Sequence, residues 1–495
     1  MEALHAIDER REKIAEATPA KIKSQLGQFM TPTIIARFMA SMFYPMAGKN
    51  IRLLDSGAGI GSLTAAFAER AAVEGARSLQ CEAWEFDPHL YNSLRHTLDA
   101  CGSLLLNAGA RYTDTIQKDD FIAAFSNIFS QDKLDGFTHA ILNPPYKKIN
   151  SKSAYRHALR MVGIETSNLY AAFVALALFS LDDGGELVAI TPRSFCNGPY
   201  FKPFRKILLD NSAIVQIHLF ESRTHAFKGD DVLQENIIFH LVKLKAQGTI
   251  IISSSSDSTF SVVSKRSVAF EDVVTPDDKD MIFHLVPEKD DEIMAKGMRL
   301  YTSTLEEIGI NVTTGPVVDF RLRVHLRQNV EKGCAPLIWP FHFENGFIAH
   351  PKNVAKKPNG IKINEETAKW LMPTGYYVIV RRLSSKEEKR RIVPSVFDPS
   401  KVQGKQIGFE NHLNVFHSGK NGLSPNVAKG LALFLGSTLA DKWLRRFSGN
   451  TQVNASDLRA LRYPTVATLM KWGSKVRDEL PSQEIIDTIV EGEIK

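Results

Sequence analysis

Short apolar segments alternate with segments of helical periodicity between residues 51 and 244. The apolar segments predict strands at 51–55, 79–85, 137–142, 186–191, 213–220 and 236–244. The segments between them predict helices at 61–74, 88–100, 169–181 and 201–210. Strands that alternate with helices favour an α/β fold, with a mostly parallel sheet and helices on both faces. The last two strands leave no room for a helix between them, so that end of the sheet is predicted to be antiparallel.

The segment before the first strand predicts two helices. Residues 2–24 are charged and carry apolar positions at helical spacing. In the following segment GQFMTP, Thr31 is expected to cap the second helix. Pro32 is expected to occupy the first helical position, where its missing N–H is tolerated.

The composition changes near residue 246. The chain becomes rich in Ser and Thr there, and Gly, Pro, Asn and basic residues dominate until about 425. We therefore predict a boundary at 246–270, between a first domain over 1–250 and a second over 260–495. A helical pattern returns at about 426–446.

The composition excludes several protein classes. Hydrophobic residues make up 44% of the 495 residues and charged residues 23%, which is typical of a globular protein and excludes wholesale disorder. The most apolar stretch, 170–181, is too short to span a bilayer, and the N-terminal segment has no secretion-signal pattern. The four cysteines lie far apart without a CxxC pair, which predicts a reducing, cytoplasmic setting with no disulfide and no metal site.

Positive charge is concentrated in one part of the chain. Residues 1–250 contain 27 Lys and Arg against 26 Asp and Glu, a balance of +1. Residues 381–465 contain 15 Lys and Arg against 6 Asp and Glu, a balance of +9. A basic block in a nearly neutral chain indicates a surface that binds a polyanion, although a solvated charged surface would give the same count.

A glycine-rich turn follows the first predicted strand. The segment LLDSGAGIGSLTAAF contains Asp55 at the end of the strand and Gly57, Ala58 and Gly59 in the turn. Glycines let the backbone turn sharply and approach a ligand closely. Glu85 ends the next strand, where an acid can accept hydrogen bonds from ribose hydroxyls. The two features predict a nucleotide-type cofactor, which can be a dinucleotide or S-adenosylmethionine.

The segment Asn143-Pro144-Pro145-Tyr146 directly follows an apolar strand. The two prolines fix the backbone and remove two donors, which leaves an Asn side chain, rigid carbonyl groups and an aromatic ring. Such a site can accept both hydrogens of an exocyclic amine while the ring stacks on the attached base. Binding of this kind localises the nitrogen lone pair and makes the amine a better nucleophile.

The segments GQFMTP, LLDSGAGIGSLTAAF, AWEFDP, KDDF and NPPY, in this order, resemble the gamma class of DNA adenine-N6 methyltransferases. The similarity covers about 20–245 and extends to FSGNTQVNASDLRALRYP near the C-terminus. It implies a Rossmann-like S-adenosylmethionine-dependent domain and a C-terminal α+β target-recognition domain. It also implies methyl transfer to N6 of an adenine flipped out of duplex DNA, in a restriction–modification system that can include a separate endonuclease.

The resemblance also implies the roles of individual residues. The target base would be held by Asn143, Pro144, Pro145, Tyr146 and Phe227. The cofactor would be bound by Gln28, Thr31, Pro32, Asp55, Gly57, Ala58, Gly59, Glu85, Asp120 and Phe121, with Asp119 as an alternative to Asp120. DNA would be contacted by Lys147, Lys148, Arg445, Arg446, Asn450, Gln452, Asn454 and Arg459. Asn454 can also simply cap a helix.

Other functions stay open at the level of sequence. NPPY also suits the amines of cytosine N4, RNA and protein glutamine, and a catalytically silent DNA-binding subunit is a further alternative. The basic C-terminal region and the position of GQFMTP disfavour an RNA or protein substrate. The intact motifs disfavour a silent subunit, and no nuclease signature is present.

Overall fold

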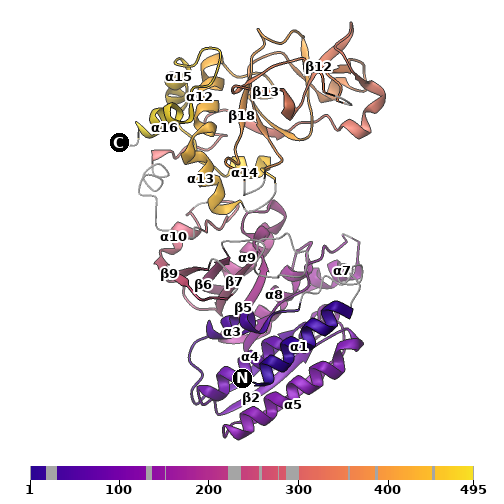
Figure 1. Cartoon of the computed structure of the whole chain (residues 1–495), viewed down its shortest axis with the longest axis vertical. Coiled ribbons are helices and arrows are strands. Elements are labelled where there is room, and N and C mark those ends of the chain that lie inside the picture. The colour runs from indigo at the N-terminus through magenta and orange to yellow at the C-terminus, as the bar shows by residue number, and fades with distance from the viewer. Residues whose placement is uncertain are drawn as a thin grey trace. The chain divides into compact units, whose positions relative to one another are not determined.

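The computed structural model describes residues 2–17, 30–129, 136–150, 152–220, 236–255, 259–276, 278–285, 300–354, 357–384, 388–448 and 452–493. The chain forms two compact units, unit 1 over Met1–Pro287 and unit 2 over Glu288–Lys495 (Figure 1). Each unit has its own sheets and its own hydrophobic core.

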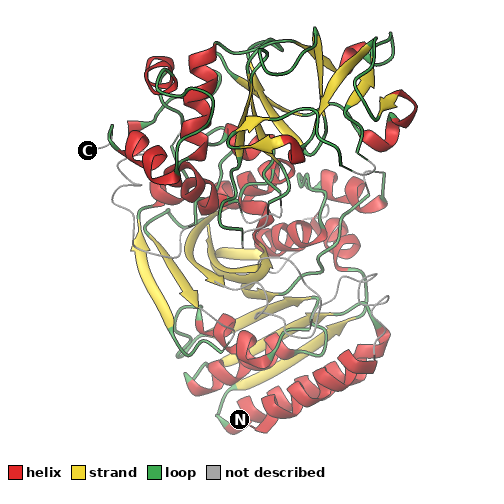
Figure 2. Cartoon of the chain, turned by 45° about the horizontal axis from the view of Figure 1, so that its top comes forward, coloured by secondary structure: helices red, strands yellow, loops and turns green. Residues whose placement is uncertain are grey.

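A nine-stranded mixed sheet forms the centre of unit 1 within the described residues (Figure 2). In spatial order its strands are β3 (Arg111–Gln117), β2 (Ser78–Trp84), β1 (Asn50–Ser56), β4 (Phe137–Leu142), β5 (Leu181–Pro192), β7 (Asn236–Lys243), β6 (Ser212–Phe220), β8 (Ile250–Ser255) and β9 (Val263–Val268). The strands from β3 to β5 run parallel, whereas β7 is antiparallel to both of its neighbours. This arrangement confirms the predicted α/β sheet with an antiparallel end.

Helices cover both faces of this sheet. The core on one face includes residues of α1 (Glu2–Ala17), α3 (Thr33–Ser41), α4 (Ser62–Val73) and α5 (Tyr91–Asn107). The core on the other face includes residues of α6 (Phe121–Phe129), α7 (Ala154–Met161), α8 (Leu169–Ser180) and α9 (Lys202–Asn211). Because side chains alternate along a strand, Leu53 of β1 packs in the first core and Leu54 in the second. Burial on both faces explains why the central strands are continuously apolar.

The boundary between the units lies later than the composition predicts. β8 pairs in parallel with β6, and β9 pairs antiparallel with β8, so both strands extend the sheet of unit 1. The short helix α10 (Phe270–Val273) follows them in the same unit. The predicted boundary at 246–270, with a first domain ending at 250, is therefore wrong. The Ser- and Thr-rich stretch there is part of the sheet rather than a linker.

The start of α3 also differs from the prediction. Pro32 is the N-cap residue and Thr33 the first helical residue. The Asp8 carboxylate of α1 accepts hydrogen bonds from the Thr33 N–H, at 3.2 Å, and from the Thr33 hydroxyl. The predicted capping by Thr31 is therefore wrong, because a side chain from the preceding helix supplies the cap. Residues 18–24 of the predicted first helix lie outside the described residues.

Unit 2 combines two sheets with a group of helices. One sheet contains, in order, β10 (Asn311–Thr314), β20 (Leu413–His417), β17 (Tyr377–Arg381), β18 (Pro394–Phe397), β14 (Phe347–Ile348) and β13 (Phe343–Glu344). The other contains β11 (Leu326–Arg327), β15 (Gly360–Lys362), β12 (Cys334–Ile338), β19 (Gln406–Phe409) and β16 (Leu371–Pro373). Strands followed by helices give unit 2 the predicted α+β character.

The helices of unit 2 are α12 (Pro425–Gly436), α13 (Thr438–Phe447), α14 (Ala455–Arg459), α15 (Val466–Gly473) and α16 (Gln483–Glu491). The single helix predicted at about 426–446 is divided at Ser437, whose hydroxyl accepts the Ala440 N–H and caps α13. α12 and α15 pack very closely, since a Cβ at Gly430 would lie 1.9 Å from the Leu469 carbonyl oxygen. None of the helices in the described ranges is long and apolar enough to cross a membrane.

Candidate functional site

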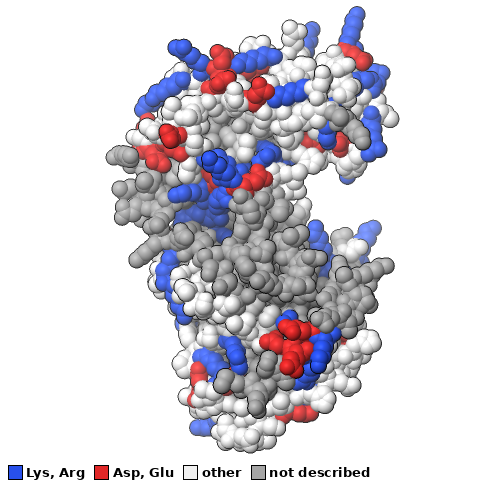
Figure 3. Space-filling model, viewed as in Figure 1, with Lys and Arg blue, Asp and Glu red and all other residues white. Residues whose placement is uncertain are grey.

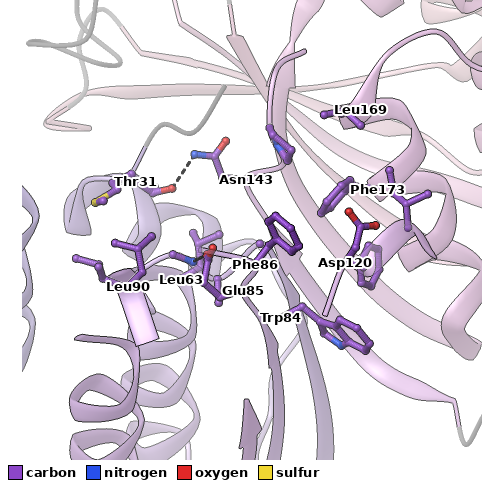
Figure 4. A pocket seen from close by; sticks show the side chains of 18 of the residues that line it. Thr31, Leu63, Trp84, Glu85, Phe86, Leu90, Asp120, Asn143, Leu169 and Phe173 are labelled. Atoms are coloured by element: carbon purple, nitrogen blue, oxygen red, sulfur yellow. Dashed lines mark hydrogen bonds between the residues drawn. The ribbon is translucent and has the colours of Figure 1, made fainter. Parts of the chain in front are cut away.

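A cavity of about 320 Å³ opens at the carboxyl ends of the four parallel strands β1 to β4 in unit 1 (Figure 4). Ligands of open α/β sheets bind at this edge. The cavity lining contains many of the predicted site residues: Thr31, Gly57, Ala58, Gly59, Glu85, Asp119, Asp120, Phe121, Asn143, Pro145 and Lys147. The fold thus gathers segments that are more than one hundred residues apart in sequence.

The glycine turn after β1 is held to the neighbouring strand. The N–H groups of Gly57 and Ala58 donate to the Trp84 carbonyl oxygen of β2, at 2.9 and 2.8 Å. Gly57 and Gly59 both have positive φ, at 95° and 58°, a conformation that L side chains rarely adopt. A Cβ at Gly59 would meet no atom within 4 Å. The backbone of the turn therefore forms an open wall of the cavity.

The Glu85 carboxylate is fixed at the end of β2. One of its oxygens accepts the Gly59 N–H at 2.8 Å, and the other accepts the Asp87 N–H at 2.7 Å. The side chain is almost fully buried, and burial raises the pKa of its carboxyl group. A carboxylate oxygen can accept a further hydrogen bond, so Glu85 offers an oriented acceptor to a ligand hydroxyl.

Asp120 and Phe121 both line the cavity, and Asp120 lies beside Phe173, apart from Glu85 (Figure 4). One Asp120 oxygen accepts the Ala123 N–H at 2.9 Å, which caps the start of α6. The other accepts a hydrogen bond from the Tyr155 hydroxyl of α7. Burial and the neighbouring Asp120 raise the pKa of Tyr155 to about 12, so this hydroxyl stays protonated and remains a donor at neutral pH.

The Asn143 side chain is oriented by two hydroxyl groups. Its Nδ2 donates to Thr31 Oγ1 at 3.0 Å, and its Oδ1 accepts from the Tyr146 hydroxyl at 3.0 Å. The Tyr146 hydroxyl also lies 3.3 Å from the Ile190 carbonyl oxygen, and burial raises the pKa of the phenol. The amide nitrogen thus faces Thr31 and the amide oxygen faces Tyr146, and the two bonds link the segment around Thr31 to NPPY.

Several predicted residues do not line the cavity. Asp55 is fully buried below the turn, and its Oδ2 accepts the Thr64 hydroxyl at 2.7 Å. Burial raises the pKa of Asp55 to about 7. Asp55 is thus held at the β1–α4 junction by Thr64, and its contact with the cofactor stays a prediction. Pro32, Pro144 and Tyr146 also lie outside the lining, and Pro32 caps α3 instead. Gln28 and Phe227 lie outside the described residues.

Other lining residues were not predicted. They include the aromatic side chains of Trp84, Phe86, Tyr155 and Phe173. Phe121 and Phe173 have ring centroids 5.0 Å apart and form an aromatic wall, whereas Phe86 is 64% exposed. Trp84 and Phe86 flank Glu85 in AWEFDP, so that motif could have indicated them. Tyr155 and Phe173 lie on helices outside the motifs, and only the packing of α7 and α8 brings them to the cavity.

Much of the basic block of unit 2 is used inside the unit. Arg391 is fully buried, and its guanidinium donates to the Ser448 carbonyl oxygen. Arg445 forms an ion pair with Asp441 at 2.7 Å and donates to the Glu388 carbonyl oxygen at 2.8 Å. These contacts hold Arg445 within the unit, and its contact with DNA stays a prediction. On the face shown in Figure 3, Lys and Arg of unit 2 are scattered among acidic and uncharged side chains.

The other residues predicted to contact DNA differ in their burial and in their hydrogen-bond partners. Asn454 caps α14, and its N–H donates to Asp457 Oδ2 at 2.9 Å, as the capping alternative anticipated. Gln452 accepts from Arg382 at 3.1 Å, and Arg459 donates to the Val312 carbonyl oxygen at 2.9 Å. Arg446 is half-buried, Lys147 and Lys148 are exposed, and Asn450 lies outside the described residues. Within the described ranges, no group of three or more His, Cys, Asp or Glu residues could hold a metal ion.

Comparison with known proteins identifies the family. Residues 69–227 match the family model described as Eco57I restriction-modification methylase. The chain is 47% identical over 467 residues to the type II methyltransferase M.BsuBI of Bacillus subtilis, covering 93% of this chain and 92% of the relative. It is 42% identical to the type II methyltransferase M.PstI of Providencia stuartii, covering 98% and 96% of the two chains.

A solved structure of a DrdV–DNA complex shares the fold, with a TM-score of 0.50 and 13% identity over 94% of this chain and 58% of that chain. This structural similarity extends through both units. The sequence similarity to the two methyltransferases also covers nearly the whole chain. The protein therefore belongs to the type II DNA methyltransferases of restriction–modification systems.

Proposed function

We propose that this DNA methyltransferase transfers a methyl group to N6 of an adenine that is flipped out of duplex DNA. The observation that carries the proposal is a single cavity lined by the glycine turn, Glu85 and Asp120 together with Asn143 and Pro145. The first three features suit a nucleoside-type cofactor, and the last two suit an exocyclic amine. The cofactor is S-adenosylmethionine, which supplies an electrophilic methyl group on its sulfonium when it is bound.

The lining fits the parts of this cofactor. In our proposal Glu85 accepts hydrogen bonds from the ribose hydroxyls, because its carboxylate is already oriented by two backbone N–H groups. Asp120 accepts from the adenine amine, and the ring of Phe121 packs on the adenine beside Phe173. The backbone of Gly57 to Gly59 passes along the cofactor, since a Cβ at Gly59 would meet no atom within 4 Å.

The target base is assigned to the Asn143 side of the cavity. Asn143 Oδ1 and the carbonyl oxygen of Pro144 would accept the two hydrogens of the amine, which directs the nitrogen lone pair toward the methyl group. Tyr146 would stack on the base and at the same time orient Asn143 through its hydroxyl. No general base is required before the transfer, because the nitrogen becomes acidic only after it is methylated.

Flipping requires an energy source outside the cavity. Extruding a base costs about a few kcal/mol, and stacking on an aromatic ring returns about 1–3 kcal/mol. Phosphate contacts would supply the remainder, and the exposed Lys147 and Lys148 beside NPPY are candidates. We assign the choice of DNA sequence to unit 2 and expect the enzyme to act in the cytoplasm, with a cognate endonuclease as a separate protein.

Product analysis tests the proposed base and atom. DNA methylated by the purified protein is digested to nucleosides and separated by chromatography with mass detection. We expect N6-methyldeoxyadenosine, whereas N4-methyldeoxycytidine would overturn the proposed target. Asn143→Ala should lose most of the product but keep the affinity for S-adenosylhomocysteine measured by calorimetry. Loss of that affinity in Asn143→Ala would contradict the assignment of Asn143 to the target side.

A further inference from the structure

A compact turn in unit 2 carries exposed basic and apolar side chains. It consists of residues 319–327, here called the basic turn, and contains two short 3-10 helices, Asp319–Arg321 and Arg323–His325, followed by β11. No motif of the sequence analysis falls on it. It lies outside the basic block of 381–465.

The basic turn is anchored to the core of unit 2 by a buried side chain and by backbone hydrogen bonds. Leu322 is 6% exposed and packs in a core cluster with Trp339 and Ile361. Before the turn, the Val317 N–H donates to the Phe409 carbonyl oxygen at 3.0 Å, and after it β11 pairs with β15. The turn is thus anchored at its middle and at both ends, so its outward side chains are presented without a large ordering cost.

Two apolar side chains of the basic turn point to solvent. Phe320 is 60% exposed and Val324 is 76% exposed. Among the described residues of unit 2, Phe320 is the one aromatic residue that is largely exposed to solvent. An exposed aromatic ring on an anchored turn can pack against a flat apolar surface such as a base.

The charge of the basic turn is positive. Arg321 and Arg323 are both exposed, and within the described part of the chain neither guanidinium group forms a hydrogen bond or an ion pair. The Arg321 guanidinium lies 5.6 Å from the centroid of the Phe320 ring, so it covers part of that ring. The one carboxylate of the turn, Asp319, lies 3.7 Å from the Lys357 ammonium, which offsets its charge. The turn therefore presents two available guanidinium groups on either side of the buried Leu322, with no uncompensated acid.

We propose that the basic turn is a DNA-contacting element, in which Phe320 packs against or between bases and Arg321 and Arg323 contact the flanking phosphates. Apolar side chains that wedge into a base step, with neighbouring basic residues on the backbone, are a known way to bind and deform DNA. The inference rests on duplex DNA being the substrate, as in the proposed function. It differs from the sequence-based expectation, which relied on Arg445 and its neighbours.

Binding measurements on the full-length protein test the two parts separately. The probe is a short fluorescent duplex carrying the site mapped by sequencing methylated DNA, and a scrambled duplex is the reference. Replacing Arg321 and Arg323 together by Ala should flatten the plot of log affinity against log salt by up to about 1.8, and weaken both duplexes alike. Phe320→Ala should leave the slope unchanged and weaken binding to the site-bearing duplex about tenfold, whereas Phe320→Leu should restore much of it.

Matched controls come from the same unit. Met470→Ala removes a side chain that is 46% exposed on α15, and Arg477→Ala removes an exposed arginine. If these controls change the binding as much as the turn variants do, or if the turn variants bind like the wild type, the proposal is overturned. A change in oligomeric state without a change in DNA binding would instead assign the turn to a protein contact and equally overturn it. The identity of the methylated base is measured independently, so failure of the proposed adenine target leaves this test intact.

Discussion

At the scale of single residues, the most informative contact is the one between Thr31 and Asn143. The resemblance assigned Thr31 to the cofactor, yet its hydroxyl accepts a hydrogen bond from the Asn143 amide at 3.0 Å. With Tyr146 on the other end of the amide, Asn143 is held by hydrogen bonds at both ends. Thr31 is thus a candidate positioning residue, because an amide rotated by half a turn would present a donor to an amine that needs an acceptor.

Thr31→Val tests this role. The variant keeps the shape of the side chain and removes the acceptor, so we expect kcat to fall about 3- to 10-fold with little change in the KM for S-adenosylmethionine. Thr31→Ser should restore kcat, since it returns the hydroxyl. A raised KM with normal kcat in steady-state assays would show that Thr31 contacts the cofactor and does not act through Asn143.

At the scale of elements, the junction of β1 and α4 contains the fully buried carboxyl group of Asp55, which accepts a hydrogen bond from Thr64. The pKa of Asp55 rises from its ordinary value of 3.8 to about 7 because of burial. Above pH 3.8 the unfolded chain releases this proton while the folded chain retains it until about pH 7. Protons bound only in the folded state stabilise it, so this contribution is full below about pH 4 and declines as the pH rises toward 7.

Asp55→Asn should remove this pH dependence. An amide cannot ionise, and it can still accept the hydrogen bond from Thr64. We therefore expect the melting temperature of the variant, relative to the wild type, to be higher at pH 8 than at pH 5. Calorimetry without cofactor at both pH values measures the difference. Parallel melting temperatures at the two pH values would mean that Asp55 ionises in the folded protein as readily as in the unfolded chain.

How well each element could be predicted from the sequence depended on where the element lies in the fold. The central strands were predicted because burial on both faces makes them apolar runs. β3 was missed because it lies at the sheet edge, where the sequence RYTDTIQ can alternate polar and apolar residues. The cavity residues on motif loops were predicted, whereas Tyr155 and Phe173 depend on helix packing. The sequence shows the net charge of the basic block. It does not show which of the basic side chains are buried and form hydrogen bonds inside unit 2, as Arg391 does.

At the scale of the whole molecule, the two units divide the work in our proposal. Unit 1 contains the cavity and all of its lining, and each unit has separate core clusters. A chain ending at Pro287 should therefore bind S-adenosylhomocysteine with nearly the affinity of the full protein. It should not methylate one DNA sequence selectively, because the proposed recognition elements are absent. Calorimetry and methylation mapping measure the two properties, and selective methylation by the shortened chain would contradict this division.

The completion of the nine-stranded sheet before residue 288 has an evolutionary consequence. Every described strand of this sheet is encoded in one uninterrupted stretch of the gene, and so is unit 2, to which we assign the choice of DNA sequence. Under this assignment, a single recombination event near that codon would exchange unit 2 and leave unit 1 intact. Descendants of one ancestral gene could in this way acquire a new DNA recognition sequence in one step, without passing through inactive intermediates.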